Sequence, residues 1–464
     1  MTETAKNSLA AGRRPSPLGW RVAPMAATAL FVLTLGAAAT GSGQPQIKSY
    51  TEADMPGLMA ATWNEDVLGG GLEAEAVKSL LQRGQLIFIK ELAQGKWLIG
   101  GGVLANASPE TIFKGYTDHP HYDQIMPETE KATAVPLGPN IVDLTIDHRI
   151  KIMTGVEVPA SYTITVYYRP PLRADWVKSA GDFEENTGYL QLIPVDGGKQ
   201  TMIFFTCYSL PRIPIVTSLI EKDPNLDLVI NMSVAIVTTR ALKKYGEAAE
   251  KREPFVPAKD QGDLVELMAK TPDTINLLIN RGGMLLIEEG PTIWATTAVS
   301  MAISPPEAFQ TATSFENFPC FQPEMKKVKI KQRTATTAKV DFEMDINYAV
   351  LSVGLAFSYD YLFNAPNNMT WKWVEGDVPS QQGNWTFIEQ DGGKKTLAIF
   401  RNTLDLKTLP GLGGFGVKSA INIEPTLEPA ILASQALITA KGIRDAANMP
   451  KAKRDEILQS CPRK

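Results

Sequence analysis

Cysteine is scarce in this sequence. Its three cysteines, Cys207, Cys320 and Cys461, are too few and too far apart to form a disulfide framework or a cysteine-based zinc site. Cys207 lies within the apolar run MIFFTCYSL, which predicts a small buried hydrophobic side chain. The sequence leaves open whether Cys320 or Cys461 pairs with a partner.

Histidine is equally scarce, and two of the three histidines are near neighbours. His119 and His121 flank a proline, with Asp118 and Asp123 close by, so both metal binding and acid–base chemistry have to be considered. A single residue between two histidines on a proline-broken turn is poor chelating geometry, so we expect a solvated turn. The sequence also lacks a glycine-rich phosphate loop, a nucleophile elbow and a paired metal motif. We therefore expect no metal, no cofactor and no catalytic residues.

Excess positive charge is missing as well. The formal net charge is −4, and residues 1–40 carry four basic side chains against one acidic, a net +3, which leaves −7 for the rest of the chain. Proteins that bind nucleic acid carry a basic patch or stripe. We therefore exclude nucleic acid as a partner.

The first forty residues have the order of an export signal. A polar stretch with three arginines precedes an uncharged segment, VAPMAATALFVLTLGAAAT, which ends in small residues. Its strongly apolar part, residues 25–35, is short for a membrane span, but with the flanking alanines the segment can serve as an uncleaved anchor. Both alternatives place the rest of the protein outside the cytoplasm, and we expect an exported, periplasmic protein.

The chain contains an internal duplication. Ser108-Pro109 recurs as Ser304-Pro305 at an offset of 196 residues, and the Asp-Gly-Gly-Lys run at 196–199 recurs at 391–394, an offset of 195. An offset this constant predicts one fold repeated in tandem. The predicted division is a signal peptide or anchor at 1–40, a linker at 41–71, a first domain at 72–253, a linker at 254–262, a second domain at 263–449 and a polar, frayed tail at 450–464.

The sequences of the two halves predict the same order of helices and strands. A helix (72–82 and 263–280) leads to a strand hairpin, and the Ser-Pro pair then caps a short helix. A further short helix or turn covers residues 122–130, and runs with period-two alternation follow from 143 and from 338. Asp196-Gly197-Gly198 predicts a hairpin turn. Long helices at 224–250 and 425–447 close the two halves, which indicates an α+β fold.

Two short motifs carry a resemblance to a known family. The first half reads Ala-Ser-Pro-Glu-x-x-Phe over 107–113 and Tyr-x-x-Ile-x-Pro over 122–127, and the second half repeats the pattern over 303–309 and 318–323. In this order and spacing the chain resembles the START-like (SRPBCC) helix-grip superfamily, most of all its polyketide cyclase/dehydrase and coenzyme Q-binding type. The resemblance covers about residues 80–250 and 278–447.

The resemblance implies two tandem helix-grip domains, each a curved antiparallel sheet wrapped around a long C-terminal helix. It also implies a cavity between the concave face of the sheet and that helix. Strand alternation nominates the residues that line this cavity: Tyr162, Tyr168, Phe204, Tyr208, Phe357, Tyr359 and Arg401. An aromatic pocket with a few hydroxyls suits a largely apolar ligand with one polar end. The alternative is that these side chains fill a core. Arg401 in that position turns outward, pairs with a carboxylate such as Asp405, or meets an anionic ligand head group.

These expectations lead to one functional interpretation and two alternatives. We expect non-catalytic, extracytoplasmic binding or transport of a lipid, quinone or sterol-like molecule. The alternatives are a cyclase/dehydrase-like or hydrolytic enzyme acting on a hydrophobic substrate, and a half that has lost its cavity and serves as an interaction scaffold. A carrier requires an apolar cavity of roughly several hundred Å³. Convergence of Tyr208, Arg401 or His148 inside the cavity would favour an enzyme.

Two connections before the long helices are unexpectedly apolar. Leu210–Ile220 and Leu409–Ile421 lie where a connecting loop would be expected to be polar. In this fold class that connection lies near the cavity mouth. One hypothesis is that both segments are lids that make transient membrane contact to pass a ligand, and the other is that they pack between the two halves.

Overall fold

The protein is represented by a computed structural model, which describes residues 50–461 apart from 63–66, 69–70, 92–96, 154–155, 215–216, 218–219, 221–224, 258–262, 281, 289, 291, 323, 349–350, 379 and 406–426. The export signal at 1–40 and the apolar segment Leu409–Ile421 lie outside these residues, as does part of Leu210–Ile220. No helix among the described residues is long and apolar enough to cross a membrane.

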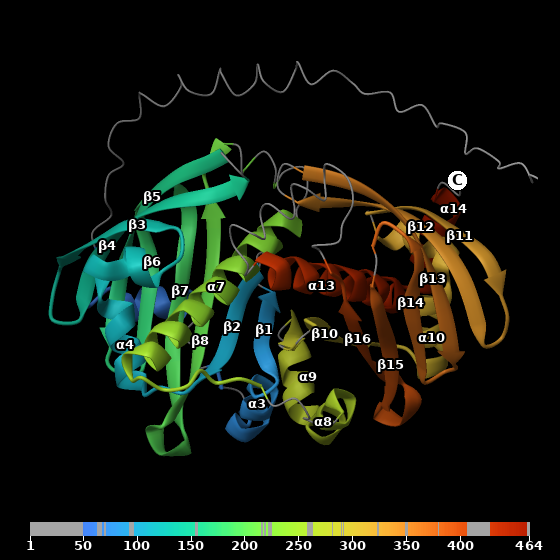
Figure 1. Cartoon of the computed structure of the whole chain (residues 1–464), viewed down its shortest axis with the longest axis horizontal. Helices are drawn as coiled ribbons and strands as arrows, with labels where there is room; N and C mark the ends of the chain where they lie inside the picture. The colour runs from blue at the N-terminus through green and yellow to red at the C-terminus, as the bar shows by residue number, and fades with distance from the viewer. Residues whose placement is uncertain are drawn as a thin grey trace, which may run out of the picture. The chain divides into compact units, whose positions relative to one another are not determined.

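The first half consists of a sheet of eight strands with helices against it (Figure 1). Helix α2 (Met55–Thr62) precedes it. The elements are α3 (Ala74–Leu81), β1 (Gly84–Glu91), β2 (Trp97–Ala105), α4 (Pro109–Thr117), η4 (His119–His121), α5 (Tyr122–Ile125), β3 (Thr129–Pro136), β4 (Ile141–Met153), β5 (Val156–Arg169), β6 (Arg173–Gly181), β7 (Phe183–Val195), β8 (Gln200–Pro211) and α7 (Asn225–Ala249).

The second half repeats this order. Its elements are α8 (Leu264–Lys270), α9 (Pro272–Asn280), β9 (Gly282–Glu288), β10 (Trp294–Met301), α10 (Pro305–Thr313), η6 (Phe315–Asn317), α11 (Phe318–Phe321), β11 (Met325–Arg333), β12 (Thr337–Tyr348), β13 (Leu351–Asn364), β14 (Asn368–Gly376), β15 (Gln382–Gln390), β16 (Lys395–Thr403), α13 (Leu427–Asn448) and α14 (Lys451–Ser460). All strand pairs of both halves are antiparallel. The predicted α+β fold of two tandem helix-grip domains is confirmed.

Local sequence explains how the repeated helices begin. The Ser108 hydroxyl accepts from the Thr111 amide at the start of α4, and Pro109 occupies the first turn, where its missing N–H costs nothing. In the second half Ser304 and Glu307 form a capping box at the start of α10. The hairpin at Asp196–Gly198 is also as predicted, with Val195 opposite Gln200.

The long helix of each half lies against one face of its sheet (Figure 1), which we call the inner face. Helix α7 packs closely on β2, where a Cβ at Gly101 would lie 2.8 Å from the Ala235 carbonyl oxygen. Only glycine permits this approach. Gly101 pairs with Phe205 on β8, so Phe205 also faces α7. The opposite, outer face carries helices α3, α8 and α9, which share a core cluster with Leu86, Phe204 and Ile399.

The two halves share one sheet of sixteen strands, which the sequence did not predict. Strand β1 pairs with β9 in an antiparallel register of seven residue pairs. Arg83-Gly84 recurs as Arg281-Gly282, an offset of 198 in this part of the repeat. At that offset Ile87 lies opposite its own equivalent, Leu285, so the pairing is symmetric about this point. On the inner face α7 contacts α13, and Met232 and Ser434 meet across that contact.

Three local predictions were wrong. Residues 129–136 and 325–333 form the edge strands β3 and β11, which the sequence analysis did not predict. Because these strands are exposed and rich in polar residues, the period-two pattern of apolar side chains does not reveal them. The helix predicted at 263–280 breaks into α8 and α9 at Pro272. The tail is not frayed from Pro450, since α14 forms and is tied to α11 by a disulfide between Cys461 and Cys320.

The disulfide closes a loop of 141 residues. The chain-entropy model gives a loop of this length about 5 kcal/mol, whereas disulfides typically stabilise a protein by about 2–4 kcal/mol. We expect Cys461→Ser to lower the free energy of unfolding by about this amount in urea titrations, through the unfolded state and through loss of α14. The double variant Cys320→Ser/Cys461→Ser should be no less stable than either single variant, and a further loss in the double variant would contradict this account.

Candidate functional site

A histidine and three tyrosines meet on the inner face of the first half. Strand β5 directs Tyr162, Ile164, Val166 and Tyr168 toward the core under α4 and α7. The Tyr168 hydroxyl lies 2.8 Å from His119 Nε2, and the His119 ring meets the edge of Tyr122 at 5.2 Å between centroids. The Tyr122 hydroxyl in turn donates to the Tyr116 carbonyl oxygen.

The prediction of a solvated His-Pro-His turn was wrong for His119. His119 is only 8 % exposed, and burial lowers the pKa of its imidazole to about 4. His121 is exposed as expected, and a 2.8 Å interaction with Asp118 raises its pKa. The η4 turn therefore points one histidine inward and the other outward. Among the described residues no group of three or more His, Cys, Asp or Glu side chains is arranged to hold a metal.

A second histidine–tyrosine pair lies further along the same strand. His148 Nε2 is 3.1 Å from the Tyr162 hydroxyl, and its Nδ1 is 3.3 Å from the Glu128 carbonyl oxygen. A carbonyl can only accept, so Nδ1 carries the proton and Nε2 accepts from the tyrosine. Burial lowers the pKa of His148, as it does that of His119. Both imidazoles are therefore neutral at pH 7.

The two pairs are well separated. Tyr162 and Tyr168 are six residues apart on β5, which corresponds to about 20 Å along an extended strand. Ile164 and Val166 lie between them on the same face and are buried. The inner face of the first half thus has an apolar middle with a hydrogen-bonding pair toward each end.

Phe204 and Tyr208 were assigned to the wrong face of β8. A Cβ at Gly102 would meet the Phe204 ring at 2.7 Å and Leu81 of α3 at 3.3 Å, so Phe204 points away from α7. Tyr208 has the same parity on the strand and follows it to the outer face. Both are buried, and burial raises the pKa of Tyr208 to about 12. The side chains of β8 that face α7 include Phe205 and Cys207.

Arg401 is also on the outer face. It shares the parity of Leu397 and Ile399, which pack with the outer-face helices, and its Nε donates to Glu288 at 2.7 Å. Its guanidinium lies 4.1 Å from the centroid of Trp294. Of the alternatives for Arg401, pairing with a carboxylate is therefore the one that the structure contains, with Glu288 as the partner.

Phe357 and Tyr359 lie in a continuous aromatic core of the second half. Both belong to the cluster that packs under α13, and Phe342 stacks on Phe357 at 5.6 Å between centroids. The Tyr359 hydroxyl donates to the Gln381 side chain. The structure thus places Tyr162 and Tyr168 on the inner face of the first half, at opposite ends, and Phe357 and Tyr359 on the inner face of the second half. Phe204, Tyr208 and Arg401 lie on the outer face. Whether any of the seven binds a ligand stays a prediction.

Equivalent inner-face positions of the two halves differ in chemistry. The hairpins align at offsets of 195 and 196, since His148 lies opposite Thr129 as Met344 lies opposite Met325, and Tyr162 lies opposite Gly181 as Phe357 lies opposite Gly376. Every polar member of the first-half site has an apolar counterpart. His119, Tyr122, His148, Tyr162 and Tyr168 correspond to Phe315, Phe318, Met344, Phe357 and Phe363.

At the centre of the inner face the side chains of the first half are smaller than those of the second half. Aliphatic residues of the first half correspond to aromatic residues of the second. Ile146, Ile164, Val166, Leu190 and Leu192 correspond to Phe342, Tyr359, Tyr361, Trp385 and Phe387. Tyr116 is an exception, because its counterpart in the second half is the smaller residue Ala312. The second half therefore fills its interior with rings, whereas the first half has smaller side chains there.

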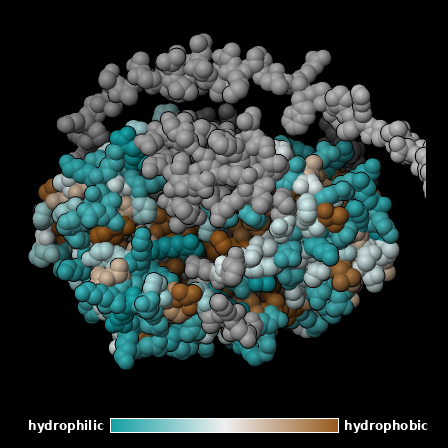
Figure 2. Space-filling view, viewed as in Figure 1, coloured by the Kyte–Doolittle hydropathy of each residue, from teal (hydrophilic) through white to brown (hydrophobic). Residues whose placement is uncertain are grey.

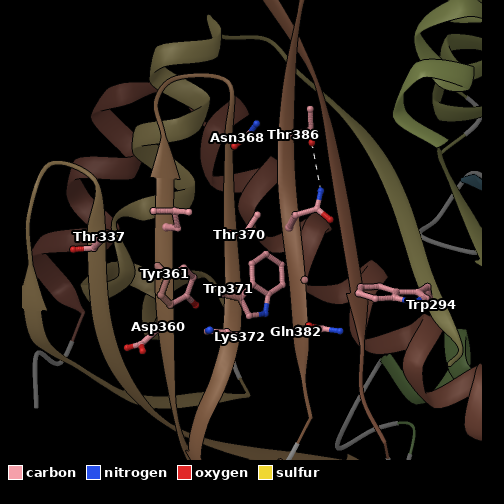
Figure 3. A pocket seen from close by; sticks show the side chains of 13 residues that line it. Trp294, Thr337, Asp360, Tyr361, Asn368, Thr370, Trp371, Lys372, Gln382 and Thr386 are labelled. Atoms are coloured by element: carbon pink, nitrogen blue, oxygen red, sulfur yellow. Dashed lines mark hydrogen bonds between the residues drawn. The ribbon is translucent and has the colours of Figure 1, made fainter. Parts of the chain in front are cut away.

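A hollow of about 610 Å³ lies elsewhere, on the outer face of the second half (Figure 3). Its lining includes Trp294, Asp360, Lys372 and Asn384. The cavity expected of a carrier was between the sheet and the long helix, so this hollow is not that cavity.

Comparisons with known proteins give matches only among solved structures. No protein-family model matches the chain, and no curated protein matches it in sequence. Among solved structures it is similar to the di-domain ARO/CYC BexL from the BE-7585A biosynthetic pathway, at 12% identity and a TM-score of 0.27, over 76% of this chain and 99% of that one.

Single-domain structures match part of the chain. A START superfamily protein from Mycobacterium smegmatis is 19% identical over 31% of this chain and 97% of that chain, with a TM-score of 0.22. A STAR-related lipid transfer protein from Xanthomonas axonopodis is 11% identical over 36% and 93%, with a TM-score of 0.26. Scores this low carry no argument about function. In the order and pairing of its own elements, the chain resembles the START-like superfamily in two tandem copies.

Acid should destabilise the protein through His119. Its pKa is about 4 when folded and near the ordinary 6.5 when unfolded, so the unfolded state binds more protons between these values. Stability is therefore lost as pH falls from about 6.5 to about 4, by up to about 3 kcal/mol. In His119→Phe, which installs the residue of the equivalent position 315, this component should vanish when urea unfolding is compared at pH 7.5, 5.5 and 4.5.

His121→Gln is the matched control. Because Asp118 raises the pKa of His121, its small contribution has the opposite sign and is lost as pH rises. A His119→Phe variant with the acid dependence of the unsubstituted protein would show that this imidazole is not the group responsible.

Proposed function

We propose that the first half binds a largely apolar ligand, of the lipid, quinone or sterol-like class, between the inner face of its sheet and helix α7. The observation that carries this proposal is the His119–Tyr168 pair, which places hydrogen-bonding atoms in an interior where the second half has Phe315 and Phe363. Buried polar groups cost free energy, and a packed aromatic core shows that this fold does not need them here.

The size of the side chains supports the same location. Between the two histidine–tyrosine pairs the first half has Ile164 and Val166, whereas the second half has Tyr359 and Tyr361. Smaller side chains leave more room for a ligand, and neutral imidazole and phenol groups suit carbonyl or hydroxyl substituents. In this proposal the second half is a filled scaffold that completes the sheet.

An enzymatic role has one specific observation in its favour. His119 is neutral at pH 7 and shares a hydrogen bond with a tyrosine whose pKa burial raises. Such a pair can relay a proton to or from a bound carbonyl compound, as a cyclase/dehydrase-like reaction on a hydrophobic substrate requires. Tyr208 and Arg401 lie on the outer face and do not take part.

We also propose that the protein acts outside the cytoplasm. The signal-like segment at residues 1–40 supports export, and the Cys320–Cys461 disulfide supports an oxidising compartment. Transient membrane contact through Leu210–Ile220 and Leu409–Ile421 belongs to the same proposal, since a periplasmic carrier has to collect its ligand from a lipid surface.

Ligand binding is tested by extraction. The exported form, purified from its own host, should carry a lipid or quinone in native mass spectrometry, and solvent extraction should recover it. His119→Phe/Tyr168→Phe should reduce the recovered ligand at least about tenfold, because two hydrogen-bonding partners are removed.

Phe363→Tyr is the control, since it places the hydroxyl of Tyr168 at the equivalent position of the second half. It should leave the recovered ligand unchanged. Equal loss in both variants would point to a general effect on stability, and an empty protein in every preparation would argue for the enzyme or for a scaffold.

The location is tested through the disulfide. In intact cells Cys320 and Cys461 should resist a maleimide reagent unless a reductant is added first, whereas a variant that lacks residues 1–40 should be labelled directly. Labelling of the full-length chain without reductant would contradict an oxidising compartment.

A further inference from the structure

The outer face of the first half is covered by a segment that precedes the domain. Met55 of α2 is completely buried against Ile141 and Val177, with Tyr167 beside them. Further along the segment, the Val67 amide donates to the Gln191 side chain at 2.9 Å. In the first half, the outer face therefore binds an apolar helix through buried apolar side chains.

The same face of the second half has lost every apolar feature of that contact but one. Ile141, Val177 and Tyr167 correspond to Thr337, Lys372 and Leu362. All three of these line the hollow of about 610 Å³ and are exposed. Each of the thirteen lining residues belongs to a strand of the sheet, namely β10, β12, β13, β14 or β15.

The hollow is lined by rows of hydrogen-bonding side chains. The strand register places Asp360, Lys372 and Gln382 side by side on β13, β14 and β15, as Figure 3 shows. In the next row Thr370 lies beside Asn384, whose amide donates to Thr386 at 3.4 Å. These rows present both donors and acceptors, and the one carboxylate and the one ammonium group of the lining balance in charge.

Of the three aromatic residues of the lining, Tyr361 and Trp371 are buried in the inner-face core, and Trp294 stands at the side of these rows. Trp294 on β10 is half-buried, and the Arg401 guanidinium lies 4.1 Å from its ring centroid. Arg401 is itself fixed by Glu288 at 2.7 Å, so one face of the ring is in a cation–π contact with a held guanidinium. The visible surface of the described residues is mostly hydrophilic with separate hydrophobic patches (Figure 2).

We propose that this hollow is a binding site for a neutral oligosaccharide. Sugar rings offer C–H faces that stack on an aromatic ring and hydroxyls that both donate and accept, which matches a tryptophan beside amide and hydroxyl rows. The balanced charge disfavours a polyanion, and the loss of the Met55-type apolar contacts disfavours a hydrophobic helix. The site is separate from the ligand space proposed under α7, so either proposal can fail without the other.

The test uses three probes on the full-length exported protein: cellohexaose, maltohexaose and chitohexaose, each titrated by calorimetry and by tryptophan fluorescence. At least one should bind with saturable heat and a change in emission. Trp294→Ala should weaken that binding about tenfold, since a stacking ring is lost. The double variant Gln382→Ala/Asn384→Ala, which leaves the core untouched, should weaken it severalfold.

Gln332→Ala is the matched control, because Gln332 is an exposed glutamine on β11 outside the hollow. It should bind as the unsubstituted protein does. The proposal is overturned if none of the three oligosaccharides binds at millimolar concentration, or if binding survives unchanged in both Trp294→Ala and the double variant.

Discussion

The antiparallel pairing of β1 with β9 is the contact on which the arrangement of both halves depends. Strands that would each form one edge of an eight-stranded sheet instead satisfy each other's backbone hydrogen bonds over seven residue pairs. The symmetric register around Ile87 and Leu285 brings the inner faces of both halves to the same side, where α7 meets α13. The buried cluster that contains Ile87 therefore includes residues of both halves.

Within this shared frame the two inner faces have become chemically different. Both keep a tryptophan on a phenylalanine, as Trp176 on Phe205 and Trp371 on Phe400, with ring centroids 5.0 and 5.3 Å apart. Around this common element the first half has two histidine–tyrosine pairs, whereas the second half has phenylalanine or methionine at those positions and its tyrosines at the centre of the face. The fold is compatible with both sets of side chains. We therefore interpret the histidine–tyrosine pairs of the first half as serving a function other than stability.

Sequence reasoning predicted the elements better than the faces. The duplication, the Ser-Pro caps and the long helices follow from local patterns, and the structure contains them. The sequence does not predict which side chains of β8 and β16 lie on the inner face and which on the outer face. Both faces of these strands are buried, so no row of polar residues marks the outer face. That is why Phe204, Tyr208 and Arg401 were misplaced. His119 was missed because a histidine beside a proline is typical of a turn, and its Tyr168 partner is 49 residues away. The one available signal was the repeat itself, which aligns His119 with an apolar phenylalanine.

The central strand pair has a consequence for any part of the chain that is produced alone. Leu86, Ile87, Phe88 and Ile89 are buried on both sides of β1, and Met284 to Ile287 are buried in the same way on β9. Separating the halves would leave each with a long, flat, hydrophobic strand and a row of unsatisfied amides and carbonyls at its border. Such an edge is a template for intermolecular sheet growth. The duplicated gene product thus protects each copy from self-association by giving it a permanent, covalently attached neighbour.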